Sequence, residues 1–185
     1  MSNLRARGGF TLVELIVTMA ILGIILAMAV PNLQTFIDKN RVVGAAEAVY
    51  GQLQLARTEA IKQSANMVAV FTPTAPWCSG FSRDTGTVCD CTQAVGGANA
   101  CTILGDGQTA VLQVVNASSF SGVTMLTGGP ASIAFNGVRG TAGVGGTVIL
   151  QSALGKQMGV TINVLGGVHV CSPTGSGSVG GYPAC

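Results

Sequence analysis

A long apolar run near the N-terminus constrains this chain more than any other feature. It extends from Phe10 to Val30 and contains a single carboxylate, that of Glu14. A helix of this length, about 31 Å, is enough to cross the hydrocarbon core of a bilayer. Because Arg5 and Arg7 precede the run, the positive-inside rule predicts a cytoplasmic N-terminus and an exported remainder.

The run differs from a cleavable secretory signal. Such a signal has an apolar core of about 7–15 residues, followed by small residues at the cleavage site. Here the run is longer, and the small residues Gly8 and Gly9 come before it. Cleavage at these glycines would therefore keep the apolar helix in the mature protein.

Glu14 is the unusual residue of the run. A carboxylate inside an apolar span costs about 2.5–3.5 kcal/mol on insertion scales and marks a candidate functional site. If the chain is cut after Gly9, the new amino group of Phe10 lies one helical turn from Glu14. In a bundle of helices, Glu14 of one copy can then pair with the Phe10 amine of another, which makes burial of both charges tolerable. The alternative is that Glu14 lies near the helix end and reaches the headgroups.

The segment 9–14, Gly-Phe-Thr-Leu-Val-Glu, resembles the class III signal of type IV pilins and type II secretion pseudopilins. The resemblance implies cleavage between Gly9 and Phe10 by a prepilin peptidase, N-methylation of Phe10, and registration of the subunit in a filament by Glu14. Pro31 matches the proline that follows the apolar segment in this family, and should kink the helix. The implied partners are the prepilin peptidase, the inner-membrane assembly platform and other pilins or pseudopilins, contacted through the N-terminal helix.

A second apolar pattern predicts that the helix continues past Pro31 to near Ser64. The spacing of three and four residues in this stripe is that of an amphipathic helix. Its members are Val42, Ala46, Val49, Leu53, Ala56 and Ala60. The charged residues lie mainly off it, at Asp38, Lys39, Arg41, Glu47, Arg57, Glu59 and Lys62. We expect an apolar sheet to cover the stripe.

Two segments of this half resemble the GspH/FimT group of minor pilins. They are residues 31–37 with 40–41, and the stretch 53–62, in which Leu-Ala-Arg-x-Glu-Ala-Ile-Lys at 55–62 is the discriminating pattern. Together with the leader, the close resemblance covers residues 1 to about 70. The remainder matches only loosely, at 133–137 and 166–170.

Composition changes after residue 70. The rest of the chain has few charges and holds most of the 27 glycines, among Val, Thr and Ser. Its basic residues are Arg83, Arg139 and Lys156, and its acidic ones are Asp84, Asp90 and Asp106. Apolar runs at 110–115, 147–151 and 159–164, separated by glycine-rich turns, are typical of strands.

These patterns predict an α+β protein, and the resemblance to pilins implies a pilin-like fold. One long N-terminal helix carries a small antiparallel β-sheet or sandwich at its C-terminal half. We expect a leader at 1–9, a transmembrane or filament-core helix at 10–30, an amphipathic helix at 31–65 and a periplasmic β-rich head at 66–185.

All six cysteines lie in the part that we expect to be exported. They are Cys78, Cys89, Cys91, Cys101, Cys171 and Cys185. An even count there indicates disulfides formed in an oxidising compartment. We expect Cys171–Cys185 to close the C-terminal loop and the other four to staple the loop 78–101, where adjacent-position geometry disfavours a Cys89–Cys91 bridge.

Metal, cofactor and catalytic sites are not expected. A metal site made of Cys89, Cys91, Cys101 and His169 would fit no zinc spacing. The glycine pattern at 175–180 has no helix after it, which the dinucleotide fingerprint requires. One histidine and three scattered acids offer little material for a nucleophile with its base or for paired carboxylates.

Binding to DNA is the main alternative. Some FimT proteins act as DNA receptors in natural transformation, and the resemblance places their Gly-Arg-x-Arg-like element at 166–169. Gly167 and His169 replace both basic positions there. DNA affinity depends mainly on phosphate neutralisation, so Arg139, Lys156 and His169 would have to converge to make a weak DNA contact.

Three functional hypotheses follow. The first is a minor pilin or pseudopilin, a structural subunit that helps to initiate or cap a filament. The second is a pilus-associated DNA receptor, and the third is a membrane-anchored periplasmic enzyme. The first predicts a single-pass bacterial inner-membrane protein with a cytoplasmic N-terminus and a periplasmic head, which then enters a type IV pilus or a type II secretion pseudopilus.

Overall fold

A computed structural model describes residues 11–104 and 109–185 of the chain. The chain divides into two compact units, Met1–Ile37 and Asp38–Cys185. One helix, α1, covers Leu12–Lys62 and supplies residues to both units. The helix expected to reach Ser64 therefore ends at Lys62, and its expected start at Phe10 lies outside the described residues.

In the first unit, Thr11 caps the beginning of α1. Thr11 Oγ1 accepts a hydrogen bond from the backbone N–H of Glu14 (3.3 Å), and Thr11 O accepts one from Leu15 N (3.2 Å). A threonine followed three residues later by a glutamate is the capping-box pattern of a helix N-terminus. Within the described residues, α1 is the one helix long and apolar enough to cross a membrane.

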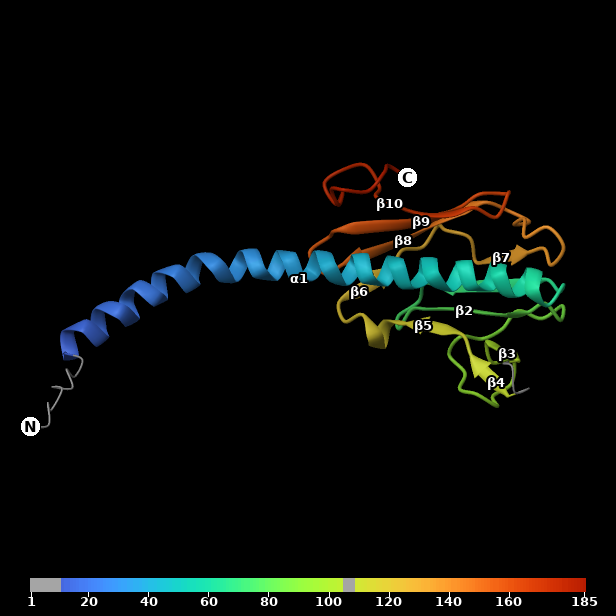
Figure 1. The fold of residues 1–185 in the computed structure, drawn as a ribbon, viewed down its shortest axis with the longest axis horizontal. Helices are drawn as coiled ribbons and strands as arrows, with labels where there is room; N and C mark the ends of the chain where they lie inside the picture. The colour runs from blue at the N-terminus through green and yellow to red at the C-terminus, as the bar shows by residue number, and fades with distance from the viewer. Residues whose placement is uncertain (1–10, 105–108) are drawn as a thin grey trace, which may run out of the picture. The chain divides into compact units, whose positions relative to one another are not determined.

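The second unit contains two four-stranded antiparallel sheets and a two-stranded hairpin (Figure 1). The first sheet has the order β5-β2-β1-β7, the second β10-β9-β8-β6, and the hairpin pairs β3 with β4. The strands of the first sheet are β1 (Met67–Thr72), β2 (Cys78–Arg83), β5 (Val114–Asn116) and β7 (Ser132–Phe135). Those of the second are β6 (Val123–Met125), β8 (Gly146–Ser152), β9 (Gln157–Ile162) and β10 (Val168–Cys171). The hairpin strands are β3 (Thr102–Leu104) and β4 (Ala110–Leu112), and a short 3-10 helix, η1, covers Ala117–Ser119.

The second half of α1 shares one hydrophobic core with both sheets. The six residues of the predicted stripe, Val42, Ala46, Val49, Leu53, Ala56 and Ala60, are completely buried. Facing them are Phe81 and Phe135 from the first sheet and Leu150 and Ile162 from the second. The expected covering of the stripe by an apolar sheet is confirmed, and two sheets provide it.

Buried polar side chains tie α1 to each sheet. Asp38, expected off the stripe, is buried and accepts a hydrogen bond from Ser152 Oγ at the end of β8. Gln52 Nε2 donates to the carbonyls of Ser79 and Gln113 (both 3.1 Å), while Gln52 Oε1 accepts from Ser79 Oγ (2.5 Å). Because unpaired polar groups are costly to bury, these bonds favour a single placement of the helix on the sheets.

The predicted strands are only partly correct. The runs 147–151 and 159–164 correspond to β8 and β9, but the run 110–115 is not one strand. Gln113 interrupts it: its N–H donates to Cys101 O (2.7 Å), and its carbonyl accepts from Phe81 N (3.2 Å). The residues before Gln113 therefore pair with β3, and those after it pair with β2.

The C-terminal end of α1 has a defined cap. Ala65 N donates to Ala60 O and Ser64 N donates to Ile61 O, both at 3.1 Å, and Ser64 adopts a left-handed conformation with φ of 48°. This is the Schellman arrangement, which satisfies the last helical carbonyls. It turns the chain directly into β1.

Two turns of the second unit meet beside this cap. Arg57 Nε donates to Gly140 O (3.0 Å). A Cβ atom on Gly166, which has φ of +81°, would lie 1.9 Å from the same carbonyl oxygen. The close approach of the turns 136–140 and 163–166 therefore requires glycine at position 166.

We predict that Gly166→Ala destabilises the chain by about 2 kcal/mol or more, because it combines left-handed strain with a backbone clash. Urea unfolding of the full chain in detergent micelles, followed by fluorescence of the single tryptophan, Trp77, measures the change. Gly180→Ala is the matched control, since a Cβ there meets nothing within 4 Å. Equal stability of the two variants would contradict the assigned contact.

Candidate functional site

The first candidate site is the exposed apolar segment of α1 that carries Glu14. Residues 11–30 are all exposed in the described chain. Glu14 lies in the first turn of α1, and no other side chain of the described residues bonds to its carboxylate. Gly9 and Phe10, the expected processing residues, lie outside the described residues. The pairing of Glu14 with the Phe10 amine of another copy therefore stays a prediction.

Pro31 lies within the first unit. Helix α1 continues through this residue without a break, from Leu12 to Lys62. The chain is therefore helical on both sides of the proline, and the kink stays a prediction.

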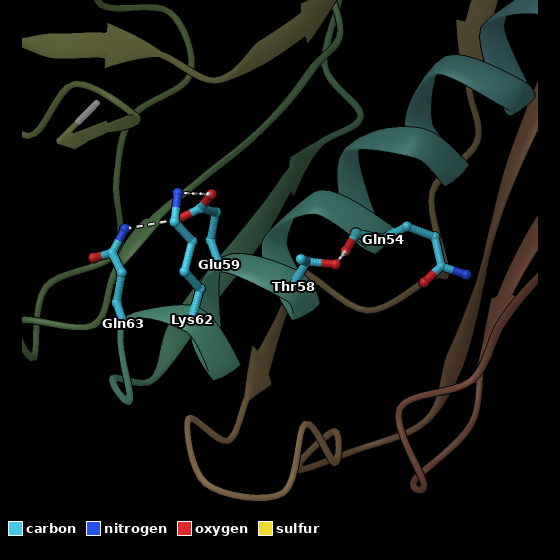
Figure 2. A network of polar contacts seen from close by, with 5 residues as sticks. All are labelled: Gln54, Thr58, Glu59, Lys62 and Gln63. Carbon is cyan, nitrogen blue, oxygen red and sulfur yellow. Dashed lines mark hydrogen bonds and ion pairs between the residues drawn. The ribbon is translucent and has the colours of Figure 1, made fainter. Parts of the chain in front are cut away.

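The pattern at 55–62 makes specific polar contacts at the end of α1 (Figure 2). Glu59, expected off the stripe, is buried, and its carboxylate accepts a hydrogen bond from Gln63 Nε2 (2.9 Å) and lies 3.5 Å from Lys62 Nζ. Thr58 Oγ1 donates to Gln54 O (2.8 Å). The burial of Glu59 is tolerable because both of its carboxylate oxygens have partners.

Three other residues of this pattern dock the helix on the head. Ala56 and Ala60 are completely buried, and Arg57 bonds to Gly140 O. Small residues bring the helix close to the sheets, and the guanidinium fastens a distant turn to it. The stretch that resembles minor pilins most specifically therefore serves to attach α1 to the head.

Three disulfides staple the second unit. They are Cys78–Cys91, Cys89–Cys101 and Cys171–Cys185. The expected closure of the C-terminal loop is present, and the other four cysteines cross-link the loop 78–101. In each place a strand glycine makes room: a Cβ on Gly80 would lie 2.6 Å from Cys101 Sγ, and one on Gly159 would lie 2.6 Å from Cys185 Sγ.

The three residues considered for DNA contact do not converge. Lys156 follows Ser152, which bonds to Asp38 at one end of the unit. Arg139 lies in the turn that Arg57 holds at the other end. Residues 38 and 57 are about 28 Å apart along the helix. His169 is exposed on β10, where it pairs with Thr161.

Metal ligands do not gather in the part of the chain that the structure describes. No group of three or more His, Cys, Asp and Glu residues there could hold an ion. Because Cys89, Cys91 and Cys101 are in disulfides, their sulfurs do not act as thiolate ligands.

The C-terminal loop rests on α1 through one polar contact. Tyr182 Oη donates to Glu47 Oε1 (3.2 Å). Burial, the hydrogen bond to Glu47 and the charge of that carboxylate all raise the pKa of Tyr182 above its ordinary value. The Cys171–Cys185 bridge closes this loop, and Val179 within it is buried. The loop thus contacts α1 at Glu47.

Comparisons with known proteins identify the family. The family model described as type II transport protein GspH matches residues 45–166. The chain belongs to this GspH family. A second model, the prokaryotic N-terminal methylation motif, matches residues 4–30. The two matches cover the core-forming half of α1 with most of the head, and the apolar segment with Glu14.

Individual relatives of this GspH family member match parts of it. Two curated fimbrial proteins of Pseudomonas aeruginosa are each 36% identical over 70 residues, which is 38% of this chain and 45% of theirs. The minor pilin FimU of P. aeruginosa has 20% identity and a TM-score of 0.49 over 73% of this chain and 91% of its own. The minor pseudopilin EpsH of Vibrio cholerae has 13% identity and a TM-score of 0.47 over 73% and 99%.

Several site residues of this GspH protein escaped sequence reasoning. The cap residue Thr11 is one of them, although its spacing to Glu14 is a capping-box signal. Gln52 and Ser79 gave no sequence signal, because their partners come from distant segments.

The raised pKa of Tyr182 predicts a pH effect on stability. Since the unfolded tyrosine loses its proton first, the stabilising contribution is complete below about pH 10 and disappears as pH rises through the folded pKa. Stability of the wild-type chain should therefore fall more steeply than that of Tyr182→Phe between about pH 9 and pH 12. Urea unfolding in detergent micelles at several pH values tests this, and parallel curves for the two chains would refute it.

Proposed function

We propose that this chain is a minor pilin or pseudopilin, a structural subunit that takes part in assembling a type IV pilus or a type II secretion pseudopilus at its initiation or tip. The observation that carries this is the methylation motif over residues 4–30 on an apolar, exposed helix that continues into a GspH head. Exposure of this apolar segment to water is unfavourable, and contact with lipid or with neighbouring helices would remove it from water.

In this proposal the chain is first a single-pass inner-membrane protein with its head in the periplasm. Prepilin peptidase cuts it after Gly9 and methylates Phe10. The inner-membrane platform then moves the helix into a bundle of other pilins. There Glu14 pairs with the N-terminal amine of a neighbouring subunit, which compensates the cost of burying both charges.

A role as DNA receptor has less support. Arg139 and Lys156 lie at different ends of the second unit, so they do not form one basic patch. DNA binders show such a patch, because phosphate neutralisation dominates their affinity. Catalysis is not proposed, since the described residues present no paired nucleophile and base.

Glu14→Ala should leave membrane insertion intact and lower incorporation into filaments by at least about tenfold, since the lost ion pair is buried. Immunoblots of sheared filament and membrane fractions measure the two quantities. Normal incorporation of this variant would show that Glu14 does not register the subunit.

Glu14→Gln separates registration from helix capping. Glutamine keeps the size and the capping-box capacity of glutamate but not its charge. If pairing with the amine matters, Glu14→Gln fails in assembly like Glu14→Ala. If Glu14 acts through the cap at Thr11, Glu14→Gln assembles normally and Thr11→Ala fails instead.

Gly9→Val should leave an uncleaved precursor, because the bulky side chain occupies the position before the scissile bond. Intact-mass measurement of the purified chain distinguishes the precursor from a mature protein that starts at methylated Phe10. Gly8→Ala, one residue earlier, serves as the control and should be processed. A mature chain from Gly9→Val would refute the cleavage assignment.

A further inference from the structure

The sequence contains one Asn-Gly pair, Asn136-Gly137, in the turn that follows β7. Asparagine is a thermolabile residue, and it deamidates fastest before glycine, which has no Cβ to hinder attack by its backbone nitrogen. That nitrogen attacks the carbonyl carbon of the asparagine side chain and ammonia leaves, which gives a five-membered succinimide ring. Water then opens the ring to aspartate or to isoaspartate.

The packing of the turn requires this pair. Gly137 is buried against the end of α1, where an added Cβ would lie 2.4 Å from Ala65 N and 2.6 Å from Ala65 C. Asn136 Oδ1 accepts hydrogen bonds from the N–H groups of Val138 (2.9 Å) and Arg139 (3.0 Å), the arrangement of an Asx turn. Gly137 therefore cannot be exchanged for a less reactive neighbour of Asn136 without a clash.

The two bonds to the Asn136 side chain do not by themselves prevent the reaction. They polarise the amide carbonyl and would stabilise the negative charge that develops on its oxygen during attack. Asn136 is also exposed, so that water reaches it. Resistance to deamidation in the folded chain therefore depends on the attacking nitrogen.

The side chain of Asn66 restrains that nitrogen. Gly137 N donates a hydrogen bond to Asn66 Oδ1 (3.0 Å). The nitrogen must lose its proton to attack, and a buried, hydrogen-bonded N–H group loses its proton only when the local structure opens. Asn66 is itself held in place, because it follows the cap of α1 and its carbonyl accepts a hydrogen bond from Asp84 N (2.8 Å).

We propose that Asn136 is a deamidation site, which Asn66 keeps unreactive in the folded head and which reacts when the turn 136–140 separates from the end of α1. This proposal does not depend on the assembly role. Isoaspartate lengthens the backbone between residues 136 and 137 by one carbon atom. Because Gly137 has no room even for a Cβ, the lengthened turn no longer fits against Ala65, and the modified head is less stable.

Deamidation of the full chain in detergent micelles tests the role of Asn66. Samples are kept in mildly alkaline buffer, and peptide mass spectrometry follows the replacement of the Asn136 amide by an acid. The folded wild-type chain should react at least about tenfold more slowly than the same chain unfolded in guanidinium chloride. Asn66→Ala removes the acceptor and should raise the rate in the folded chain at least about fivefold. Asn66→Asp keeps an acceptor oxygen and should leave the rate unchanged.

A variant elsewhere on α1 controls for a general loss of stability. Tyr182→Phe removes the hydrogen bond to Glu47, away from the turn, and should not change the rate at Asn136. Trp77 fluorescence shows whether each variant is folded during the incubation. The comparison of folded and unfolded wild-type chains needs no substitution, so it tests the proposal even if a variant fails to fold.

The effect of isoaspartate on the head is measured on the reacted chain. The isoaspartate form, separated chromatographically from the aspartate form, should unfold at a lower guanidinium concentration than Asn136→Asp. That variant keeps acceptors for the N–H groups of Val138 and Arg139 without lengthening the backbone.

Equal rates in the folded and unfolded wild-type chains would overturn the proposal, and so would an unchanged rate in folded Asn66→Ala. An equal rise in rate in Tyr182→Phe would do the same, because the rate would then follow general stability. An isoaspartate form as stable as Asn136→Asp would refute the stated effect on the turn.

Discussion

Burial of one face of α1 is the interaction on which the head depends. Each sheet has an apolar face whose exposure to water would be unfavourable. The helix stripe from Val42 to Ala60 packs against both faces and forms one hydrophobic core with them. Three of the six stripe residues, Ala46, Ala56 and Ala60, are alanines, which let the helix axis approach the strands. Apolar burial of this kind is the main favourable term in folding.

Polar contacts then select one docking geometry from the many that apolar packing permits. Asp38 with Ser152 and Gln52 with Ser79 set the position of the helix along the sheets. In the described part of the chain, every buried side-chain nitrogen or oxygen has a hydrogen-bond partner. A shift of the helix by one turn would leave these groups unpaired at a cost of about 1–3 kcal/mol each.

The two halves of α1 have opposite tasks within one helix. The apolar side chains of the segment 12–30 are exposed and available to lipid or to other helices. The apolar stripe of the segment 42–60 is buried in the core of the head. Because the disulfides and the core lie in the second unit, that unit can remain folded while the surroundings of the first segment change. This division suits a protein that is held in a membrane before it enters a filament.

The sequence by itself determined the long helix, the processing motif, the amphipathic stripe, the family and the Cys171–Cys185 bridge, because each depends on local spacing or on a short motif. Only the tertiary structure decided the rest. Gln113 divides one apolar run between two sheets, and Glu59 is buried although its helical position looks exposed. Arg139 and Lys156 lie at opposite ends of the head, and the turns 136–140 and 163–166 meet although they are far apart in sequence. Long-range contacts of this kind join residues up to 135 positions apart, as for Glu47 and Tyr182, and no local pattern encodes them.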